Sequence, residues 1–249
     1  MPLYPNDADP RILYRDAHLV AVDKAAGLLV HRSPIAAGEQ EALLQRLRDA
    51  LGVRVYPAHR LDRPTSGLVI FGLSPQAGAR LSHLFETRQV DKRYLAVVRG
   101  WLGPEGVIDY PLQDAPELPL RPAVTLWRSL ARVELPIPVG RYPVARYSLV
   151  EARPLTGRLH QIRRHFHHSF HPIVGDTTHG EGRHNRLFRD HYGCRRLLLH
   201  AHSLRLPHPW GSAALELRAP PDGAWQELME RLGWGGVVAG GPWEGPGGA

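Results

Sequence analysis

The stretch PAHRLDRPTSG, residues 57–67, places one aspartate between two arginines. If Arg60 or Arg63 pairs with Asp62, the carboxylate stays ionised well below neutral pH. An ionised carboxylate can act as a nucleophile, as a general base or as a stabiliser of positive charge. The same residues also favour a turn, because Asp62 precedes Arg-Pro and Thr-Ser-Gly follows. The stretch alone therefore leaves two interpretations open, a catalytic carboxylate and an Asx turn.

A second group of chemically capable residues is the histidine-rich stretch LHQIRRHFHHSFHPIVGDTTHG, residues 159–180. On a helix, two side chains share a face when they are three or four residues apart. His165 and His168 meet this condition, but no zinc-enzyme HExxH pattern is present, so a structural metal is the weaker hypothesis. We interpret the histidines as exposed to solvent or facing RNA; they are His160, His165, His167, His168, His171 and His179.

Other motifs that would indicate a cofactor or a nucleophile are absent from the sequence. No GxGxxG follows a predicted strand, and GGVVAGG near the C-terminus has no helix after it, so a nucleotide cofactor has no support. No GxSxG nucleophile elbow occurs either. Cys194 is the only cysteine, which excludes an internal disulfide, and we interpret it as a small packed residue.

The composition is that of a soluble globular protein. The chain of 249 residues is 43% hydrophobic and 22% charged, so it can bury a sizeable core. It has no apolar run of about 18 residues, and the N-terminus MPLYPNDADP is acidic and proline-bearing, unlike a targeting peptide. We therefore expect a cytoplasmic protein with no membrane association.

The net charge of +7 favours a polyanionic partner, and nucleic acid is the commonest one. Nearly all basic residues are arginines, since only Lys24 and Lys92 are lysines, and arginine suits phosphate binding and stacking. Abundant Arg, Ala, Gly and Pro also results from GC-rich coding, so composition alone leaves nucleic-acid binding open.

Hydrophobic periodicity predicts the elements that must position these residues. The run GLVIFGL at 67–73, directly after the aspartate loop, is typical of a buried strand, and Ser74-Pro75 supplies an N-cap and a first-turn proline for a helix. Residues 101–143 are proline-rich and predict a long excursion with short strands. The remaining predictions are helices at 39–51, 159–168, 183–193 and 222–234, a hairpin at 12–24, and strands at 92–100, 145–155, 196–207 and 213–220.

These elements predict an α+β fold with a mainly antiparallel sheet, because strands and helices do not alternate regularly. No linker divides the predicted core, so we expect one domain over residues 1–234. Residues 235–249 are rich in glycine and are predicted to form a disordered tail.

Several motifs, taken in chain order, resemble the RluA-type pseudouridine synthases. They are HRLDRPTSGLVIFG, KRYLAVVRG, TGRLHQIRRHF and RLLLHAHSLRLPHP, and the opening LYRDAHLVAVDKAAGLLVHRS is similar as well. The resemblance covers about residues 11 to 220, and ordered motifs over that span are far more specific than any single one. The stretch HPIVGDTTHGEGRHNRLFRDHYGCRRLLLHA is most similar to a tRNA-modifying branch of the family.

The resemblance implies a fold and a reaction. The implied fold is α+β, with a mainly antiparallel mixed sheet, flanking helices and a central RNA-binding cleft. The implied reaction converts a specific uridine of structured RNA to pseudouridine, without cofactor or metal, by breaking the N1–C1′ bond and joining C5 to C1′. The implied partner is RNA, tRNA above all, with no obligate protein partner. The alternatives are ribosomal RNA as substrate, or a non-catalytic RNA-binding factor on the same scaffold.

The resemblance also assigns catalytic roles to single residues. Asp62 matches the family's indispensable carboxylate, and attack on C1′, addition to the uracil ring and removal of a C2′ proton are all open to it. Tyr94 matches an active-site tyrosine whose ring can stack on the extracted uracil. Arg163 matches the arginine that pairs with the catalytic aspartate. On spacing alone, Arg158 and Arg164 compete with Arg163 for that role.

The predicted RNA contacts follow from the same resemblance. Arg60 corresponds to a residue that enters the RNA stack where the uridine leaves, since a planar guanidinium can fill the gap. Leu199 is the predicted apolar wall of the uracil pocket, with Leu198 as the alternative if the register differs by one. The predicted RNA-binding set is His59, Arg60, Arg63, Arg158, Arg164, Arg183, Arg186 and Arg189, of which the last three recur at every third residue.

Overall fold

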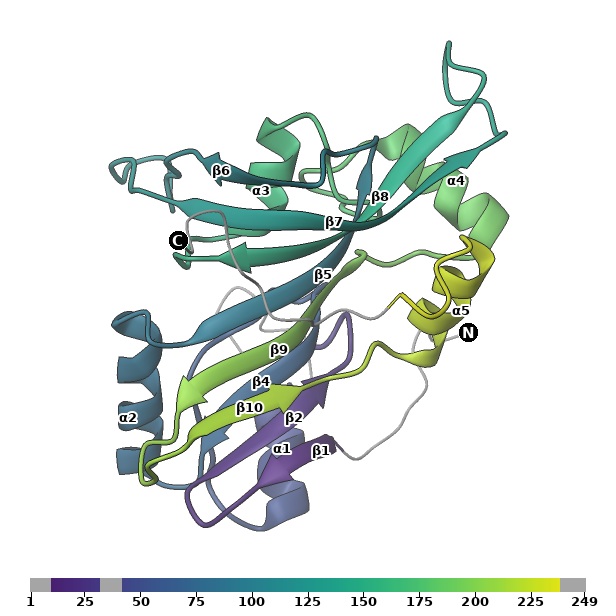
Figure 1. The fold of residues 1–249 in the computed structure, drawn as a ribbon. Coiled ribbons are helices and arrows are strands. Elements are labelled where there is room, and N and C mark those ends of the chain that lie inside the picture. The colour runs from purple at the N-terminus through teal and green to yellow at the C-terminus, as the bar shows by residue number, and fades with distance from the viewer. Residues whose placement is uncertain (1–9, 32–41, 238–249) are drawn as a thin grey trace. The chain divides into compact units, whose positions relative to one another are not determined.

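The computed structural model describes residues 10–31 and 42–237, which contain ten strands and five helices (Figure 1). These residues divide into two compact units. The first unit takes the chain up to Asp91 together with Ala201–Pro220, and the second takes Lys92–His200 together with the residues from Pro221 onward. Most of the predicted glycine-rich tail and the start of the predicted helix at 39–51 lie outside the described residues.

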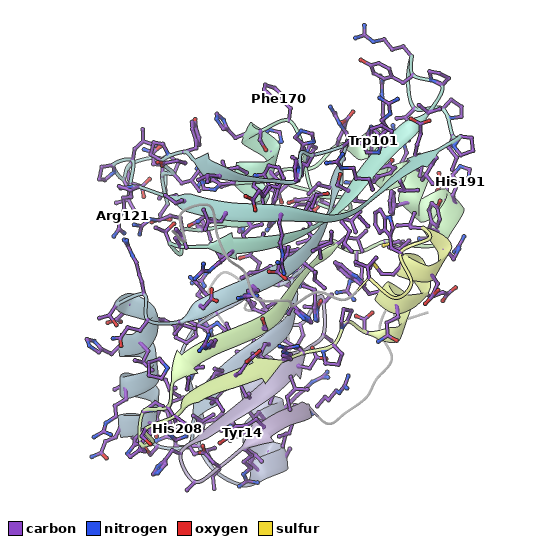
Figure 2. All side chains as sticks on the ribbon, viewed as in Figure 1. Tyr14, Trp101, Arg121, Phe170, His191 and His208 are labelled. Atoms are coloured by element: carbon purple, nitrogen blue, oxygen red, sulfur yellow. The ribbon has the colours of Figure 1, made fainter. Side chains whose placement is uncertain are left out.

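The first unit begins with the predicted hairpin. Strands β1 (Arg11–Arg15) and β2 (Leu19–Lys24) are antiparallel, and the Oδ1 atom of Asp16 closes the turn by accepting from the backbone N–H groups of His18 and Leu19. The other carboxylate oxygen of Asp16 binds Tyr14 Oη at 2.9 Å and His208 Nε2 at 2.8 Å. Tyr14 and His208 are labelled in Figure 2. Asp16 therefore connects the β1–β2 turn to the loop before β10.

The buried strand of the first unit is β4 (Ser66–Gly72), which follows the aspartate loop as predicted. It pairs antiparallel with β2 and with the short β3 (Tyr56–Pro57), while β9 (Leu199–Pro207) pairs antiparallel with β10 (Ala214–Arg218). Every residue of β4 is buried, which explains why its sequence is a continuous apolar run rather than an alternating one.

Helices α1 (Leu43–Leu51) and α2 (Pro75–Glu86) belong to the same unit. The Ser74 hydroxyl accepts from the backbone N–H of Ala77 at 3.1 Å, and Pro75 occupies the first turn, so the predicted start of α2 is confirmed. Leu81 of α2 joins the core cluster that Leu68 and Ile70 of β4 form.

The second unit is built on four antiparallel strands in the order β5-β8-β7-β6. Their bounds are β5 (Asp91–Arg99), β6 (Glu105–Asp109), β7 (Val124–Leu135) and β8 (Ala145–Pro154). Strand β7 has 12 residues, so the proline-rich segment at 101–143 is more regular than predicted. Its prolines lie outside VTLWRSLARVEL, and the long pairing with β8 stabilises the strand.

Two hydrophobic clusters cover opposite faces of these four strands. One contains Leu95 and Tyr147 and packs against α4 (Gly182–Tyr192) and α5 (Gly223–Arg231). The other contains Ala96 and Val150 and packs against α3 (Gln161–His168). The α+β fold, with a mainly antiparallel mixed sheet and flanking helices, is confirmed. A single domain over 1–234 and a central RNA-binding cleft stay predictions. Among the described residues, no helix is both long and apolar enough to span a bilayer.

Candidate active site

Asp62 lies in the loop between β3 and β4 of the first unit and is half-buried. The backbone N–H of Thr65 donates to the backbone carbonyl of Asp62 at 3.0 Å, which makes Asp62–Thr65 a β-turn. The hydrogen bond that closes this turn uses the backbone carbonyl and not the side-chain carboxylate. A turn at Asp62 and a catalytic role for its carboxylate are therefore compatible.

A buried lysine anchors the aspartate turn. Lys24 ends β2 and is 0% exposed, and its Nζ donates to the carbonyls of Ala25 at 3.0 Å, Leu28 at 2.8 Å and Arg63 at 3.1 Å. A buried ammonium is costly unless its hydrogen bonds are made, and three carbonyls match its three hydrogens. Because Arg63 follows Asp62, this contact fixes the backbone beside the carboxylate. Sequence reasoning missed Lys24, although one of only two lysines in an arginine-rich chain was a signal.

Arg63 adds a second tie to the same segment. Its backbone carbonyl accepts from the N–H of Gly27 at 2.8 Å, and its Nε donates to the carbonyl of Gly27 at 3.0 Å. The exposed Arg63 side chain thus has a structural contact within the first unit. Its predicted contact with RNA stays a prediction.

His59 and Arg60 precede Asp62 and differ in their surroundings. His59 Nε2 accepts from the backbone N–H of Ile70 at 3.2 Å, and its ring stacks on Phe85 of α2 with centroids 4.3 Å apart. These contacts give His59 a clear structural role. Arg60 is exposed, as an arginine that enters an RNA stack would have to be. RNA contact by either residue stays a prediction.

Gly67 is the position where the aspartate loop enters β4. Its φ is +107°, and a Cβ there would lie 2.2 Å from the backbone oxygen of Ala201 in β9. No side chain fits so close an approach of two backbones, so glycine is required at this position. The end of the aspartate loop is therefore fixed by backbone packing.

Tyr94 lies on β5 in the second unit, opposite Ala152 of β8, and is half-buried. It packs against the hydrophobic cluster that includes Leu199, which is 3% exposed. Leu198 belongs to the cluster on the other face of the strands. Of the two leucines considered for the uracil pocket, Leu199 is the one that shares a cluster with Tyr94.

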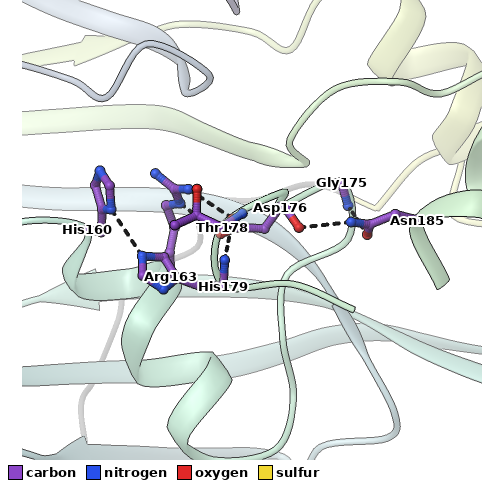
Figure 3. Close-up of polar contacts among 7 residues, drawn as sticks. All are labelled: His160, Arg163, Gly175, Asp176, Thr178, His179 and Asn185. Carbon is purple, nitrogen blue, oxygen red and sulfur yellow. Dashed lines mark hydrogen bonds and ion pairs between the residues drawn. The ribbon is translucent and has the colours of Figure 1, made fainter. Parts of the chain in front are cut away.

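Arg163 lies on α3 and forms a buried ion pair with Asp176 (Figure 3). Its Nε donates to Oδ2 at 2.7 Å and its Nη2 donates to Oδ1 at 2.9 Å, which is the bidentate geometry of a strong guanidinium–carboxylate pair. The side chains of Arg163 and Asp176 are 4% and 0% exposed. The predicted pairing of Arg163 with Asp62 stays a prediction.

The loop that carries Asp176 is held on several sides. Burial alone would raise the pKa of Asp176, but the Arg163 hydrogen bond and the backbone N–H groups of His179 and Thr178 hold this pKa below its usual value. Asn185 of α4 accepts from the N–H of Gly175 and donates to the carbonyl of Asp176, both at 2.8 Å. Sequence reasoning treated this segment only as a loop and missed Asp176.

The histidines differ from the predicted set of exposed residues. His165 is 0% exposed: its Nε2 donates to the carbonyl of Tyr110 at 3.0 Å, and its Nδ1 accepts from the Thr125 hydroxyl at 2.9 Å. Burial lowers the pKa of His165, which favours the neutral ring that these contacts need. The prediction of a solvent- or RNA-facing side chain is wrong for His165, because the helix face it occupies is covered by β7. His167 and His168 are exposed, as predicted.

The remaining histidines make specific contacts. His160 Nδ1 and His179 Nε2 are 3.0 Å apart (Figure 3), and His171 Nδ1 donates to the carbonyl of Arg99 at 2.7 Å. His168 stacks on Tyr110 with ring centroids 3.6 Å apart. Within residues 10–31 and 42–237, no three His, Cys, Asp or Glu side chains are grouped as metal ligands would be.

Arg158 and Arg164 hold the segment that connects β6 to β7. Arg158 Nε donates to the carbonyl of Pro122 at 3.3 Å, and Arg164 Nη1 donates to the carbonyl of Gln113 at 2.8 Å. Their predicted RNA contacts stay predictions, alongside this structural role. The predicted helical arginines of α4, which are Arg183, Arg186 and Arg189, are all exposed.

The chain is similar in sequence and in fold to known proteins. The family model described as RNA pseudouridylate synthase matches residues 18–168. Two curated relatives carry the name tRNA pseudouridine synthase C: one from Vibrio cholerae is 48% identical over 90% of this chain and 96% of its own length, and one from Salmonella typhi is 48% identical over 91% of each. The solved structure of human RNA pseudouridylate synthase domain containing 1 matches with a TM-score of 0.70 and 26% identity, covering 88% of this chain and 86% of that one.

Proposed function

Because the chain belongs to the RNA pseudouridylate synthase family, we propose that it converts a specific uridine of tRNA to pseudouridine. Family membership makes the chain an RNA pseudouridine synthase and makes RNA its substrate. The tRNA substrate is supported by relatives that are 48% identical over about 90% of the chain and are named for tRNA. The net charge of +7 suits this polyanion. The bacterial, tRNA-modifying relatives also support a cytoplasmic location.

The reaction is an isomerisation, so atoms balance without a co-reactant. The N1–C1′ bond breaks, C5 bonds to C1′, the proton on C5 leaves, and N1 gains a proton. We assign the essential carboxylate to Asp62, which can attack C1′, add to the uracil ring or remove a C2′ proton. Each route needs an ionised carboxylate held in one position. The β-turn at Asp62 and the contacts of Lys24 with the adjacent backbone support this assignment.

Tyr94 and Leu199 are proposed to receive the uracil. An aromatic ring gives a flat surface on which an extracted base can stack, and an apolar wall excludes water from the base. Both residues belong to one hydrophobic cluster of the second unit, with Tyr94 at its half-buried margin. A half-buried ring at the edge of a cluster can contact a ligand, whereas a fully buried core tyrosine cannot.

Arg163 is proposed to act as a positioning residue. The Arg163 guanidinium binds the Asp176 carboxylate through two hydrogen bonds. Asp176 in turn holds the loop of residues 175–180 by accepting from the backbone N–H groups of Thr178 and His179. Arg60 is proposed to occupy the space that the uridine leaves in the RNA, since extracting a paired base costs roughly a few kcal/mol. The exposure of Arg60 supports that role.

The observation that carries this proposal is the intact HRLD loop, with its Asp62 turn, in a chain of this family. The test is to map pseudouridine in total RNA from cells with and without the chain. We expect one tRNA position to lose pseudouridine, to regain it with the wild-type chain, and to stay unmodified with Asp62→Asn. Loss of a ribosomal RNA site instead would assign the alternative substrate, and an unchanged map would contradict the proposal.

A further inference from the structure

The hairpin of β7 and β8 continues beyond its last paired residues into an ordered tip. Leu135 pairs with Ala145, and residues 136–144 then form what we call the arm. In the arm, Val139 and Tyr142 exchange two backbone hydrogen bonds, of 3.0 and 3.2 Å. Gly140 and Arg141 lie at the turn between them. Figure 1 shows the arm projecting from the sheet of the second unit on the side where α4 lies.

The arm packs against α4. Ile137 and Val139 pack against the hydrophobic cluster that contains Leu187 and Phe188 of α4. The Arg183 guanidinium of α4 lies over the turn, since a Cβ on Gly140 would be 2.6 Å from its Nη1 atom. At the base of the hairpin, Tyr147 Oη lies 2.7 Å from His184 Nδ1. Side chains of the arm and of α4 therefore keep a constant spacing.

Arginines and two aromatic rings, those of Tyr142 and Trp101, lie on the surface of the arm and the base of its hairpin. Tyr142 is 58% exposed, and Arg141 donates to its hydroxyl at 2.9 Å. Trp101, labelled in Figure 2, is 44% exposed, and the Arg146 guanidinium lies 4.4 Å from its ring centroid. Exposed arginines interleaved with aromatic rings are the composition of a nucleic-acid contact.

The carboxylates of the same region are already occupied by other arginines. Glu134 binds Arg146, Glu181 binds Arg99, and Asp190 binds Arg189. On the arm and α4, the arginines that have no ion pair with any described carboxylate are Arg141, Arg183 and Arg186, and all of them are exposed. Among the described residues, none of these three guanidinium groups is held in an ion pair, although Asp190 interacts electrostatically with Arg186.

We propose that the arm and α4 form a second RNA-contact surface, which binds the backbone of the tRNA substrate away from the modified uridine. The proposal rests on the proposed function and extends it. Tyr94 lies opposite Ala152 near one end of β8, and the arm ends just before Ala145 at the other end. Seven residues of strand at about 3.3 Å each separate these two ends by roughly 23 Å. The arm therefore contacts a part of the RNA that is distinct from the extracted base.

The expected chemistry is phosphate binding by the three arginines, with Tyr142 available to stack on an exposed base. A guanidinium binds phosphate through two parallel N–H donors, and the fixed spacing of the arm and α4 selects for a folded RNA of matching shape. A short stem-loop that carries only the target uridine would engage this surface less fully than a whole tRNA would.

The test compares two triple variants that remove the same charge. The first is Arg141→Gln, Arg183→Gln and Arg186→Gln; the control is Arg11→Gln, Arg48→Gln and Arg218→Gln, exposed arginines of the first unit that each have a carboxylate partner. The dissociation constant of purified unmodified tRNA is measured across a series of salt concentrations. Each lost phosphate contact makes the plot of the logarithm of the dissociation constant against the logarithm of the salt concentration less steep by about 0.7 to 0.9. The slope for the first variant should therefore be smaller than the wild-type slope by roughly 2 to 3. The control should keep the wild-type slope.

A second pair of variants tests the same surface at a position where substitution should not unfold the protein. Tyr142→Phe keeps the ring and Tyr142→Ala removes it, at a position too exposed to disturb the core. We expect about tenfold weaker tRNA binding for the alanine variant and little change for phenylalanine. The arm triple variant should also lose more affinity for whole tRNA than for a stem-loop with the target uridine.

The outcomes separate this inference from the proposed function. If the wild-type chain modifies tRNA but the arm triple variant keeps its salt slope, the arm does not bind RNA and the inference is wrong. The same result is expected if the arm instead binds a protein, since only RNA is present in the assay. If the wild-type chain forms no pseudouridine in any tRNA, the proposed function itself fails, whatever the arm variants do.

Discussion

Asp62 and Asp176 both lie near arginines, and the structure holds these two aspartates in different ways. Asp176 is fully buried, and four donors bind its oxygens: two from Arg163 and the backbone N–H groups of Thr178 and His179. Asp62 is half-buried, and its loop is fixed through backbone contacts of its neighbours, above all by Lys24 and Arg63. A carboxylate whose oxygens accept four hydrogen bonds in the interior of the fold is a weak nucleophile or base, whereas the half-buried Asp62 is accessible to a substrate.

We infer a structural role for Asp176, and a catalytic role for Asp62 remains our proposal. Asp62 lies between two arginines in the sequence, whereas the arginine partner of Asp176 precedes it by 13 positions and is evident only from the structure. The two aspartates differ in burial and in how their loops are held: Asp176 holds its loop through its side-chain oxygens, whereas the hydrogen bond that closes the turn at Asp62 uses a backbone carbonyl. Substitutions at the two positions should therefore affect different measurements.

The largest expected effect is on turnover, at Asp62. Asp62→Asn keeps the size of the side chain and removes its charge, so we expect kcat for pseudouridine formation to fall by at least about a thousandfold. The free energy of unfolding should change by less than about 1 kcal/mol, because the turn uses the backbone. Thermal unfolding and a tRNA modification assay on the same preparation check both parts. A large loss of stability would place Asp62 with Asp176 as a structural residue.

The next effect is on stability, at the Arg163–Asp176 pair. Arg163→Met leaves a buried carboxylate without its partner, which should cost about 3 to 5 kcal/mol of unfolding free energy. The double variant Arg163→Met with Asp176→Leu removes both charges and should recover a large part of that loss. Denaturant unfolding of the two variants measures the difference. A change below about 1 kcal/mol for Arg163→Met would show that the pair does not stabilise the fold.

A smaller effect is expected at Lys24, where stability and turnover should change together. Lys24→Met leaves buried carbonyls without a donor and should cost about 2 to 4 kcal/mol, while loosening the Asp62 turn and lowering kcat. Lys24→Arg should not restore either quantity, because a planar guanidinium does not direct three donors at three separate carbonyls. Lys92→Met is the comparison variant, since Lys92 is the only other lysine and lies on β5 of the second unit, where it donates to the carbonyl of Thr156 at 3.2 Å. Equal effects of the two methionine variants would contradict the anchoring role of Lys24.

The smallest effect concerns pH. Burial lowers the pKa of His165 and of His179, so below about pH 6.5 the unfolded chain binds more protons at these residues than the folded chain does. The free energy of unfolding should therefore decrease as pH falls from 7 to 5. Asp176, whose pKa is lowered, stays ionised in this range and adds nothing to the slope.

Urea unfolding at several pH values measures this slope. His165→Gln should make it shallower, and His191→Gln, at an exposed position of α4, serves as the control. A free energy of unfolding that stays constant or rises between pH 7 and pH 5 would contradict the prediction.

The sequence predicted elements whose signals are local. The Ser74 cap and Pro75 define the start of α2, and the apolar run after the aspartate loop identifies β4, because each signal lies within a few residues. The ordered motifs likewise led from HRLD, KRYLA and HQIR to the family. These features follow from short-range chemistry that the chain displays directly.

The missed features depend on contacts between distant segments. Lys24 binds the carbonyl of Arg63 across 39 positions, and His165 is buried by Tyr110 and Thr125, which precede it by 55 and 40 positions. Helical spacing identified the faces of α3 but not which face β7 covers. The length of β7 was also underestimated, since its stability comes from pairing with β8 and not from its own sequence.

The most direct test of the account is single-turnover release of the C5 hydrogen. Conversion of uridine to pseudouridine replaces the C5–H bond with a C5–C1′ bond, so tRNA labelled with tritium at uridine C5 releases the label into water. With enzyme in excess, we expect the wild-type chain to release one equivalent per tRNA. Asp62→Asn should bind the same tRNA and release none on that timescale. Release at the wild-type rate by Asp62→Asn would contradict the assignment of Asp62 as the catalytic carboxylate.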